Sequence, residues 1–329
     1  MLDLHHILKH DNAPEGTVEA LKEFWDRSLF QPWQEIGARP SKEIRGKMVE
    51  LGWHLAGCPA LPSEDLLSKI SHIIETLHLG SLIVDDIQDD SLERRGLPTL
   101  HRLHGLPLAL NLGNFLYFQA LNLVSQLKIN EAYQHAAAQK IAETLRDAHL
   151  GQALDVSVAI DQVERAKIPK LVETSLRLKS GALMKLSVQL GALLNPEFKN
   201  WSALDSFGEA FGSCLQKLDD VGNFTIDSSL EKHLEDLKLR RPTWIWSVLA
   251  QTGSDQDWLN FNFAIRALPS LDLLRQFIKT SPLKDTAFKM AVQDLETVLT
   301  NLKTHFSLQD SCPAFVLTSQ LTARLTHAY

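Results

Sequence analysis

Two acidic clusters carry the clearest chemical signal in the sequence. The first occupies residues 85–90 (DDIQDD), and in a helix its Asp85 and Asp89 fall one turn apart on the same face. Like charges at that spacing repel each other, so a bound cation is expected. Carboxylate oxygens suit a hard ion such as Mg²⁺, which completes its shell with water and phosphate oxygens. A solvated helix end is the alternative, but the apolar residues 82–84 directly before the cluster argue against it.

The second cluster occupies residues 219–223 (DDVGN). An acid and an amide, Asp219 and Asn223, are again one helical turn apart. Two such faces across a bundle of helices could hold several Mg²⁺ ions around one diphosphate group. These ions would neutralise a departing diphosphate and so promote cleavage of a carbon–oxygen bond. Asp-Asp pairs also occur by chance, so nearby positive residues are needed to support the interpretation.

Arg94 and Arg95 follow the first cluster within about two helical turns. Adjacent arginines point to different sides of a helix or turn, so this pair could reach two anions. The guanidinium fork also binds diphosphate oxygens well. The alternative is that both arginines only pair with Asp90 and Glu93 at the surface.

Further candidate cations are more widely spread along the chain. Lys42 and Arg45 lie near the N-terminus, and Lys179 begins a Lys-Ser-Gly segment. Each of them, taken alone, is an ordinary solvated charge. His78 lies seven residues before Asp85 on the same side of a helix, where a buried core histidine is the alternative.

The elements that must position these residues are predicted to be helices. Apolar residues recur every three or four positions over 66–77 and again over 291–306, which is the spacing of a buried helix face. Runs of alternating β-branched residues and hairpin pairs such as Asn-Gly are absent from the sequence, so no strand is predicted. Chain breakers are sparse and no linker divides the sequence. We therefore expect one large all-α domain over residues 1–329.

Composition excludes several classes of function. The chain has 329 residues, 44% of them hydrophobic and 22% charged, which is typical of a globular protein with a full core. A net charge of −7 argues against a nucleic-acid partner. The three cysteines are far apart and predict neither disulfides nor a zinc site. Neither a signal peptide nor a membrane span is visible, so we expect a soluble, cytoplasmic protein.

Taken in order, these features resemble the trans-polyprenyl diphosphate synthases, especially geranylgeranyl diphosphate synthases of the eukaryotic type. The resemblance runs from about residue 39 to residue 246 and is densest in segments 78–89, 94–99, 110–118, 151–155, 179–181 and 216–220. It implies a single bundle of helices around a deep central cavity, the isoprenoid synthase type of fold, usually as a homodimer or higher homo-oligomer. The implied reaction joins isopentenyl diphosphate to an allylic diphosphate (dimethylallyl, geranyl or farnesyl), with Mg²⁺ as cofactor. Geranylgeranyl diphosphate is the expected product.

The resemblance also implies a role for individual residues. The metal ligands would come from the two acidic motifs: Asp85, Asp86, Asp89, Asp219, Asp220 and Asn223. The groups that bind the allylic diphosphate would be Arg94 and Lys179. Those that bind isopentenyl diphosphate would be Lys42, Arg45, His78 and Arg95. Ser180 and Gln216 would line the reacting centre.

The sequence departs from the family pattern in two places. Gly46 follows Arg45 where the family usually has proline. Segment 235–243 looks shortened and lacks the usual Gly-Lys pair, so either Arg240 or Arg241 is expected to supply the charge of that lysine. Asn223 at the end of the second motif is shared with eukaryotic-type members.

Product length would be set by the cavity along the helix that carries Asp85. Gly80 and Ser81 lie one turn before the motif and are expected to border that cavity, where farnesyl-making relatives have aromatic residues. Phe115 and Phe118 on the following helix are candidates for its floor, with ordinary core packing as the alternative. Small residues at the first two positions predict elongation beyond fifteen carbons.

Two other functions share part of this pattern. A class I terpene cyclase also ionises a prenyl diphosphate between two metal clusters, but it binds one diphosphate and needs no second anion site. A non-catalytic subunit of a heteromeric synthase is expected to have lost an acidic cluster, and both are present. The combined pattern therefore favours the synthase.

Overall fold

The computed structural model describes residues 16–40, 44–58, 64–225 and 234–326. These ranges are almost entirely helical, which confirms the predicted all-α fold. By its internal contacts the chain divides into two compact units. Unit 1 comprises Met1–Lys42 and Leu79–Phe118, and unit 2 comprises Glu43–His78 and Gln119–Tyr329. The single domain over 1–329 stays a prediction.

Unit 1 is built around a small apolar core. Its elements are α2 (Thr17–Trp25), the π-helix η1 (Asp26–Phe30), α3 (Gln31–Gly37), β1 (Glu93–Arg94), β2 (Leu97–Pro98), α6 (Leu100–His104) and parts of α5 (Glu64–Gln88) and α7 (Leu106–Ser125). Buried Ile36 of α3, Ile83 of α5 and Leu112 of α7 pack into one cluster. This core fixes the end of α5 that carries the first acidic motif.

The strands of unit 1 form a hairpin that the sequence did not predict. Within the described ranges they are the only strands, paired antiparallel as Glu93 with Pro98 and Arg94 with Leu97. The two residues in the turn of this hairpin, Arg95 and Gly96, have φ angles of 57° and 78°. Two successive positive φ angles are the signature of a type I′ turn, which is usually built from Asn-Gly or Asp-Gly. An Arg-Gly pair gave no such signal.

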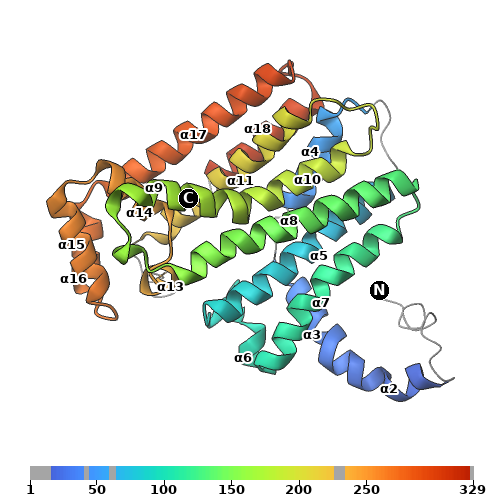
Figure 1. Cartoon of the computed structure of the whole chain (residues 1–329), viewed down its shortest axis with the longest axis horizontal. Helices are drawn as coiled ribbons and strands as arrows, with labels where there is room; N and C mark the ends of the chain where they lie inside the picture. The colour runs from blue at the N-terminus through green and yellow to red at the C-terminus, as the bar shows by residue number, and fades with distance from the viewer. Residues whose placement is uncertain (1–15, 41–43, 59–63, 226–233, 327–329) are drawn as a thin grey trace. The chain divides into compact units, whose positions relative to one another are not determined.

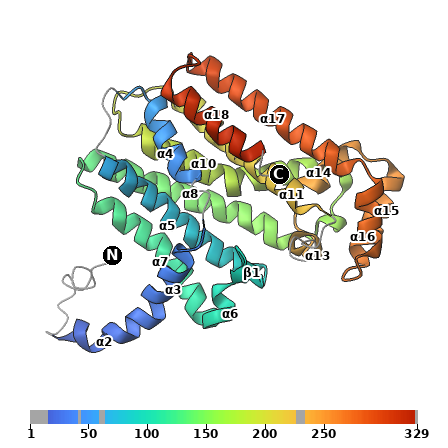
Figure 2. The same ribbon diagram turned by 180° about the vertical axis from the view of Figure 1, so that it is seen from behind.

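Unit 2 contains most of the helices. They are α4 (Ile44–Leu55), the first part of α5, the last part of α7, α8 (Glu131–Ser157), η2 (Ile160–Gln162), η3 (Arg165–Lys167), α9 (Ile168–Leu176), η4 (Arg177–Gly181), α10 (Ala182–Ala192), α11 (Trp201–Asn223), α13 (Glu235–Lys238), α14 (Trp244–Thr252), α15 (Asp255–Arg266), α16 (Asp272–Thr280), α17 (Leu283–His305) and α18 (Pro313–Thr326). Helix α10 packs against α4 and α11, and α11 packs in turn against α17 (Figures 1 and 2).

The two helices predicted from periodicity are confirmed. The apolar stripe of residues 66–77 lies on α5, where Ile70, Ile73 and Leu77 are buried. The stripe of residues 291–306 lies on α17, where Ala291 and Leu295 are buried. Among the residues placed by the structure, no helix is both long and apolar enough to cross a membrane.

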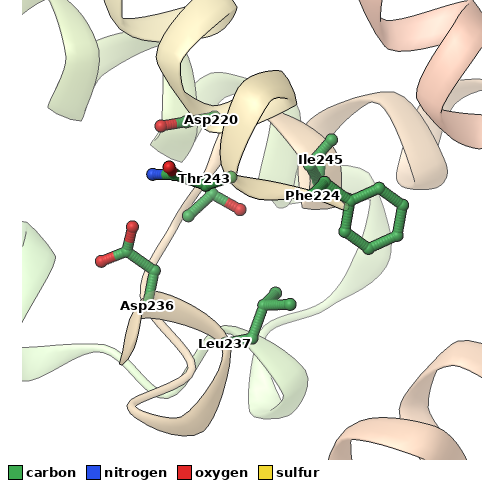
Figure 3. A pocket seen from close by; sticks show the side chains of 7 residues that line it. Asp220, Phe224, Asp236, Leu237, Thr243 and Ile245 are labelled. Atoms are coloured by element: carbon green, nitrogen blue, oxygen red, sulfur yellow. The ribbon is translucent and has the colours of Figure 1, made fainter. Parts of the chain in front are cut away.

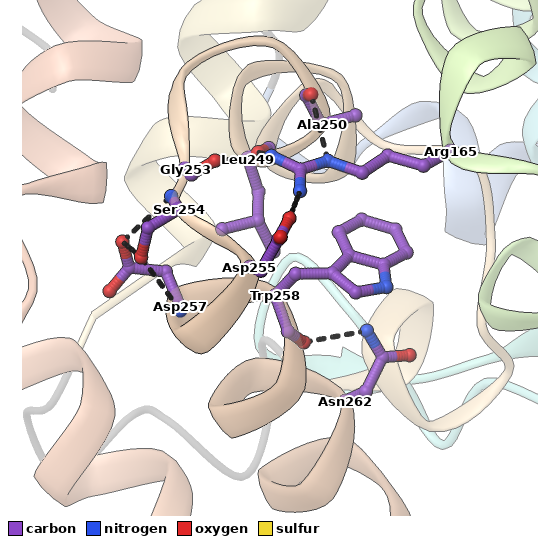
Figure 4. A network of polar contacts seen from close by, with 9 residues as sticks. All are labelled: Arg165, Leu249, Ala250, Gly253, Ser254, Asp255, Asp257, Trp258 and Asn262. Atoms are coloured by element: carbon purple, nitrogen blue, oxygen red, sulfur yellow. Dashed lines mark hydrogen bonds and ion pairs between the residues drawn. The ribbon is translucent and has the colours of Figure 1, made fainter.

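The end of α14 is held by one arginine of unit 2. Arg165 Nε donates to the carbonyl oxygen of Ala250 at 3.0 Å, and Arg165 Nη1 lies 3.0 Å from Asp255 Oδ1 (Figure 4). Its guanidinium also lies over the ring of Trp258, 5.4 Å from the centroid. Arginine therefore satisfies carbonyl groups that a helix leaves unpaired at its C-terminus, and it ties α14 to α15.

Candidate active site

The first acidic motif lies at the C-terminal end of α5, in unit 1. Asp85 and Asp86 belong to the last helical turn, and α5 ends at Gln88. Asp89 keeps the helical register, because its N–H donates to the carbonyl oxygen of Asp85 at 2.9 Å. Asp85 and Asp89 therefore lie one turn apart, as predicted, and both are partly exposed.

Asp86 has a different environment from Asp85. It is only 1% exposed, and Arg94 donates to its Oδ1 through Nε at 2.7 Å and through Nη2. Arg94 Nη2 also lies 3.8 Å from Asp85 Oδ2. Burial raises the pKa of Asp86, and the adjacent Arg94 charge opposes that rise. Arg94 thus pairs with the motif itself, and Asp86 holds the arginine in place.

Arg95 points to another partner. Its Nη1 donates to the carbonyl oxygen of Arg39 at 3.3 Å, whereas Arg94 reaches Asp86. The two adjacent arginines therefore have different directions, as the sequence predicted for a turn.

In unit 2, the Lys-Ser-Gly segment lies on the π-helix η4 between α9 and α10. Lys179 Nζ donates to Asp155 Oδ2 of α8 at 2.7 Å. Arg241 is buried as well, and its Nη1 donates to the carbonyl oxygen of the same Asp155 at 3.1 Å. Asp155 therefore anchors two cations from distant parts of the sequence. Asp155 ends segment 151–155, one of the segments that carry the family resemblance, and no role was predicted for it from the sequence.

A chain of hydrogen bonds links Ser180 to the second acidic motif within unit 2. Ser180 Oγ donates to Gln216 Oε1 at 2.9 Å, and Gln216 Nε2 donates to Asp220 Oδ1 at 3.0 Å. The backbone N–H of Trp244, at the start of α14, donates to Asp220 Oδ2 at 2.7 Å. Both oxygens of Asp220 are therefore used inside the protein. Burial raises its pKa to about 7, although the bonds from Gln216 and Trp244 act in the opposite direction.

Close packing of η4 on α11 makes this chain possible. A Cβ atom added to Gly212 of α11 would lie 2.5 Å from the carbonyl oxygen of Ser180. A Cβ atom added to Gly181 would likewise meet the carbonyl oxygen of Glu209 at 2.8 Å. Only glycine permits this approach, so these two residues bring Ser180 within reach of Gln216.

A small pocket lies beside the second motif. Figure 3 shows the carboxylates of Asp220 and Asp236 on one side and the apolar Phe224 and Leu237 on the other. Asn223, the last residue of α11, and Thr243 also line it. Asp219, next to Asp220, is only partly buried.

The remaining predicted residues fall into two cases. Lys42 lies outside the described residues. Arg45 is on α4 and His78 on α5, both half-buried in unit 2. Gly46, where the family usually has proline, donates its N–H to Glu75 Oε1 at 3.3 Å. Proline has no N–H, so the departure from the family pattern has a structural use here.

Arg240 has a different partner from Arg241. Its Nη1 lies 3.5 Å from Oδ2 of the buried Asp161, which Arg266 also approaches at 3.7 Å. Its carbonyl oxygen accepts the N–H of Ile160 at 2.9 Å. Arg240 therefore braces the segment against η2, while Arg241 lies beside Asp155.

The residues predicted to border the product cavity have different surroundings, and their role stays a prediction. A Cβ atom on Gly80 would lie 2.9 Å from the carbonyl oxygen of Gly113, so Gly80 packs against α7. Phe115 packs edge-to-face on Trp33, with ring centroids 6.2 Å apart. Phe118 is 71% exposed, so its ring forms no buried floor within this chain.

The donor set of the two motifs fits a hard divalent ion. The partly exposed groups, Asp85, Asp89, Asp219 and Asn223, offer carboxylate or amide oxygens, the ligands that Mg²⁺ prefers. Among the residues that the structure places, no group of three or more His, Cys, Asp or Glu side chains is assembled as a ready-made metal site.

An all-α fold with two such motifs is that of an isoprenoid synthase. A family model described as polyprenyl synthetase matches residues 26–276. The chain belongs to the polyprenyl synthetase family. This membership confirms the family, the fold class and the prenyltransferase class of enzyme predicted from the sequence.

Individual relatives show how far the similarity extends. A geranylgeranyl pyrophosphate synthase of Hericium erinaceus is 29% identical over 253 residues, covering 68% of this chain and 72% of that protein. A terpene synthase of Matsumurasca onukii is 29% identical over 217 residues, covering 64% of this chain and 66% of that protein. A polyprenyl synthase structure from Caulobacter crescentus CB15, complexed with calcium and isoprenyl diphosphate, covers 97% of this chain and 92% of its own. Its TM-score is 0.73 and its identity 18%, a likeness of fold.

Proposed function

We propose that this chain condenses isopentenyl diphosphate with allylic diphosphates, with Mg²⁺ as the metal and geranylgeranyl diphosphate as the product. The observation that carries the residue assignment is the convergence in unit 2 of Lys179, Ser180, Gln216, Asp220 and Arg241. These residues come from three separate segments, yet two hydrogen-bonded networks hold them. The name of the Hericium erinaceus relative supports the product.

The roles proposed for unit 1 follow from its charges. Asp85 and Asp89 are proposed as metal ligands, and Asp86 keeps Arg94 oriented toward the allylic diphosphate. Arg95 is proposed to bind isopentenyl diphosphate. Bound Mg²⁺ would supply positive charge that helps the allylic diphosphate leave.

The roles proposed for unit 2 are parallel. Asp219 is proposed as a metal ligand, with Asn223 supplying an amide oxygen one turn later. Lys179 is proposed to bind the allylic diphosphate, and Asp155 holds its ammonium group in one orientation. Ser180 and Gln216 are proposed to line the reacting centre, and the hydrogen bond between them fixes the orientation of both polar groups.

The chemistry needs no further base from the protein. When the allylic carbon–oxygen bond breaks, the diphosphate takes the electron pair and a carbocation remains. The double bond of isopentenyl diphosphate then attacks this cation and forms the new carbon–carbon bond. The proton lost in the last step is proposed to go to the released diphosphate.

Arg241, and not Arg240, is proposed to replace the family lysine. Arg241 is buried beside Asp155, which also holds Lys179, so its positive charge lies near a second cation of the proposed site. Arg240 is instead engaged with Asp161.

The function is tested by incubating the protein with isopentenyl diphosphate and each allylic primer, in Mg²⁺ or in excess EDTA. We expect a twenty-carbon diphosphate in Mg²⁺ and none in EDTA, with products identified by mass. A product that stops at fifteen carbons would overturn the proposed length. Failure to consume isopentenyl diphosphate with every primer would overturn the condensation itself.

A terpene cyclase is the second candidate, because the Matsumurasca onukii relative is a terpene synthase. It would act on one prenyl diphosphate and release an olefin or alcohol with free diphosphate. The same assay therefore separates the two: hydrocarbon formed without isopentenyl diphosphate would favour the cyclase.

We also propose a homodimer in the cytoplasm. Leu110 and Phe118 of α7 are exposed apolar residues, which suits a surface that a partner subunit covers. Light scattering on the purified chain tests the dimer, and a monomer across the working concentration range would contradict it.

A further inference from the structure

Arg39 is a buried charge that none of the roles above uses. It lies just after the end of α3 and is only 3% exposed. Taking a guanidinium group out of water is costly unless hydrogen bonds replace those of the solvent. Its partners therefore indicate what the side chain is there to hold.

Those partners lie on both strands of the hairpin in unit 1. Arg39 Nη2 donates to the carbonyl oxygen of Pro98 in β2 at 2.8 Å, and Nη1 donates to that of Arg94 in β1 at 3.2 Å. Glu35 Oε1, 3.6 Å from Nη2, provides the nearest counter-charge. A planar fork can grip two acceptors at once, which a lysine ammonium group does less well.

The hairpin needs support of this kind. Each strand has two residues, and a two-stranded ribbon is marginally stable by itself. Leu92, just before β1, and Leu97 of β2 are exposed and bury little surface. Arg95 carries a positive φ angle, which a non-glycine residue adopts only at a cost in free energy.

The contact is reciprocal. While the side chain of Arg39 holds the hairpin backbone, its own carbonyl oxygen accepts a hydrogen bond from Arg95 Nη1 at 3.3 Å. Arg39 thus contacts both the main chain of Arg94 and the side chain of Arg95. These are the two arginines to which diphosphate binding is assigned.

We propose that Arg39 is a positioning residue, which clamps both strands of the hairpin and so fixes where Arg94 and Arg95 present their guanidinium groups to the substrates. The inference rests on the proposed function of those two arginines. It assigns Arg39 no contact with substrate.

The test uses Arg39→Lys, which keeps the charge but loses the fork, and Arg39→Gln, which keeps one donor group without charge. Together with Arg95→Ala and the Arg39→Lys/Arg95→Ala double variant, Arg39→Lys forms a double-mutant cycle. Arg27→Ala, an exposed arginine on η1 of the same unit, is the matched control. Each variant is measured for the KM of isopentenyl diphosphate, for kcat and for thermal unfolding.

We expect Arg39→Lys to raise the KM about three- to tenfold, with a smaller change in kcat. Arg95→Ala should raise the KM at least as much, and Arg27→Ala should change nothing. In the Arg95→Ala background, Arg39→Lys should add at most about a twofold effect, because the side chain it positions is gone. A residue that only stabilises the fold would give independent effects that multiply.

The outcomes separate the two proposals. An unchanged KM in Arg95→Ala would reject the proposed role of Arg95 itself. A raised KM in Arg95→Ala with normal values in both folded Arg39 variants would reject only the positioning role. Multiplying effects in the double variant would also reject it. If neither Arg39 variant folds, the residue is needed for folding, and the proposal is overturned.

Discussion

The second aspartate of each acidic motif is buried, but its partners differ between the two units. In unit 1, Asp86 accepts two hydrogen bonds from the cation Arg94, both at Oδ1, and its buried Oδ2 has no hydrogen-bond partner among the residues that the structure describes. In unit 2, Asp220, 5% exposed, accepts one from the neutral amide of Gln216 and one from the backbone N–H of Trp244. The neighbouring first aspartates, Asp85 and Asp219, are less buried.

This comparison indicates that the two aspartates of each Asp-Asp pair have different roles. In both units the second aspartate is used to fix the surrounding structure, which leaves the first as the proposed ligand for metal. In unit 1, Asp86 fixes the position of Arg94, so this cation lies directly against the acidic motif. In unit 2 the cations Lys179 and Arg241 lie against Asp155 instead.

The largest expected effect comes from removing the first aspartates. Asp85→Ala or Asp219→Ala should lower kcat by roughly a thousandfold or more, because each removes a ligand and the charge that holds the metal. Thermal unfolding should change little, since both side chains are partly exposed. Near-normal turnover of both variants in Mg²⁺ would mean that the first aspartates are not the ligands.

A smaller effect is expected at the cations of unit 2. Arg241→Ala should lower kcat/KM for the allylic substrate by about ten- to a hundredfold, the equivalent of a lost charge-assisted hydrogen bond. Arg240→Ala is the matched control and should stay within about threefold of the wild type, because its partner is Asp161. The reverse order of the two effects would assign the family lysine's role to Arg240.

The next comparison concerns stability in unit 1. Asp86→Ala leaves Arg94 without its buried partner, so the free energy of unfolding should fall by about 1–3 kcal/mol. Arg102→Ala breaks an exposed pair with Asp90 and should cost less than about 1 kcal/mol. Denaturant titration of both variants measures the difference. Equal losses would contradict an anchoring role for Asp86.

A pH dependence of stability is also expected in unit 2. The pKa of Asp220 is raised to about 7 in the folded protein, so the folded state holds a proton that the unfolded state releases near its ordinary, lower pKa. This contribution to stability is therefore complete in acid and is lost as the pH rises toward and through 7. Asp220→Asn should flatten that part of the stability curve, measured in EDTA. An unchanged slope would show that Asp220 does not titrate there.

Much of this arrangement could be predicted from the sequence, and the parts that could not be predicted have physical reasons. The helical period predicted α5 and α17, and the four-residue spacing of Asp85 and Asp89 is kept in the structure. Local patterns could not tell Asp86 from Asp85, because their difference depends on Arg94 returning through a hairpin whose Arg-Gly turn gave no signal.

The anchors of the site depend on contacts between distant segments. Asp155 is 86 residues from Arg241, and Arg39 is 59 residues from Pro98. Contacts at such separations produce no periodic pattern in a single sequence, so they could not be predicted from it. The resemblance to a family placed the proposed ligands, but it could not show which of Arg240 and Arg241 lies beside Asp155.

The division of labour between adjacent aspartates is tested most directly in unit 2, where Asp219 and Asp220 are neighbours. Binding of inorganic pyrophosphate in the presence of Mg²⁺ is measured by calorimetry for the wild type, Asp219→Asn and Asp220→Asn. The wild type is expected to bind, and Asp219→Asn to lose most of this binding. Asp220→Asn should retain clearly more of it than Asp219→Asn, because an asparagine can still accept the Trp244 N–H, although its NH2 group then faces the Nε2 donor of Gln216. Loss of binding in Asp220→Asn with normal binding in Asp219→Asn would contradict the account.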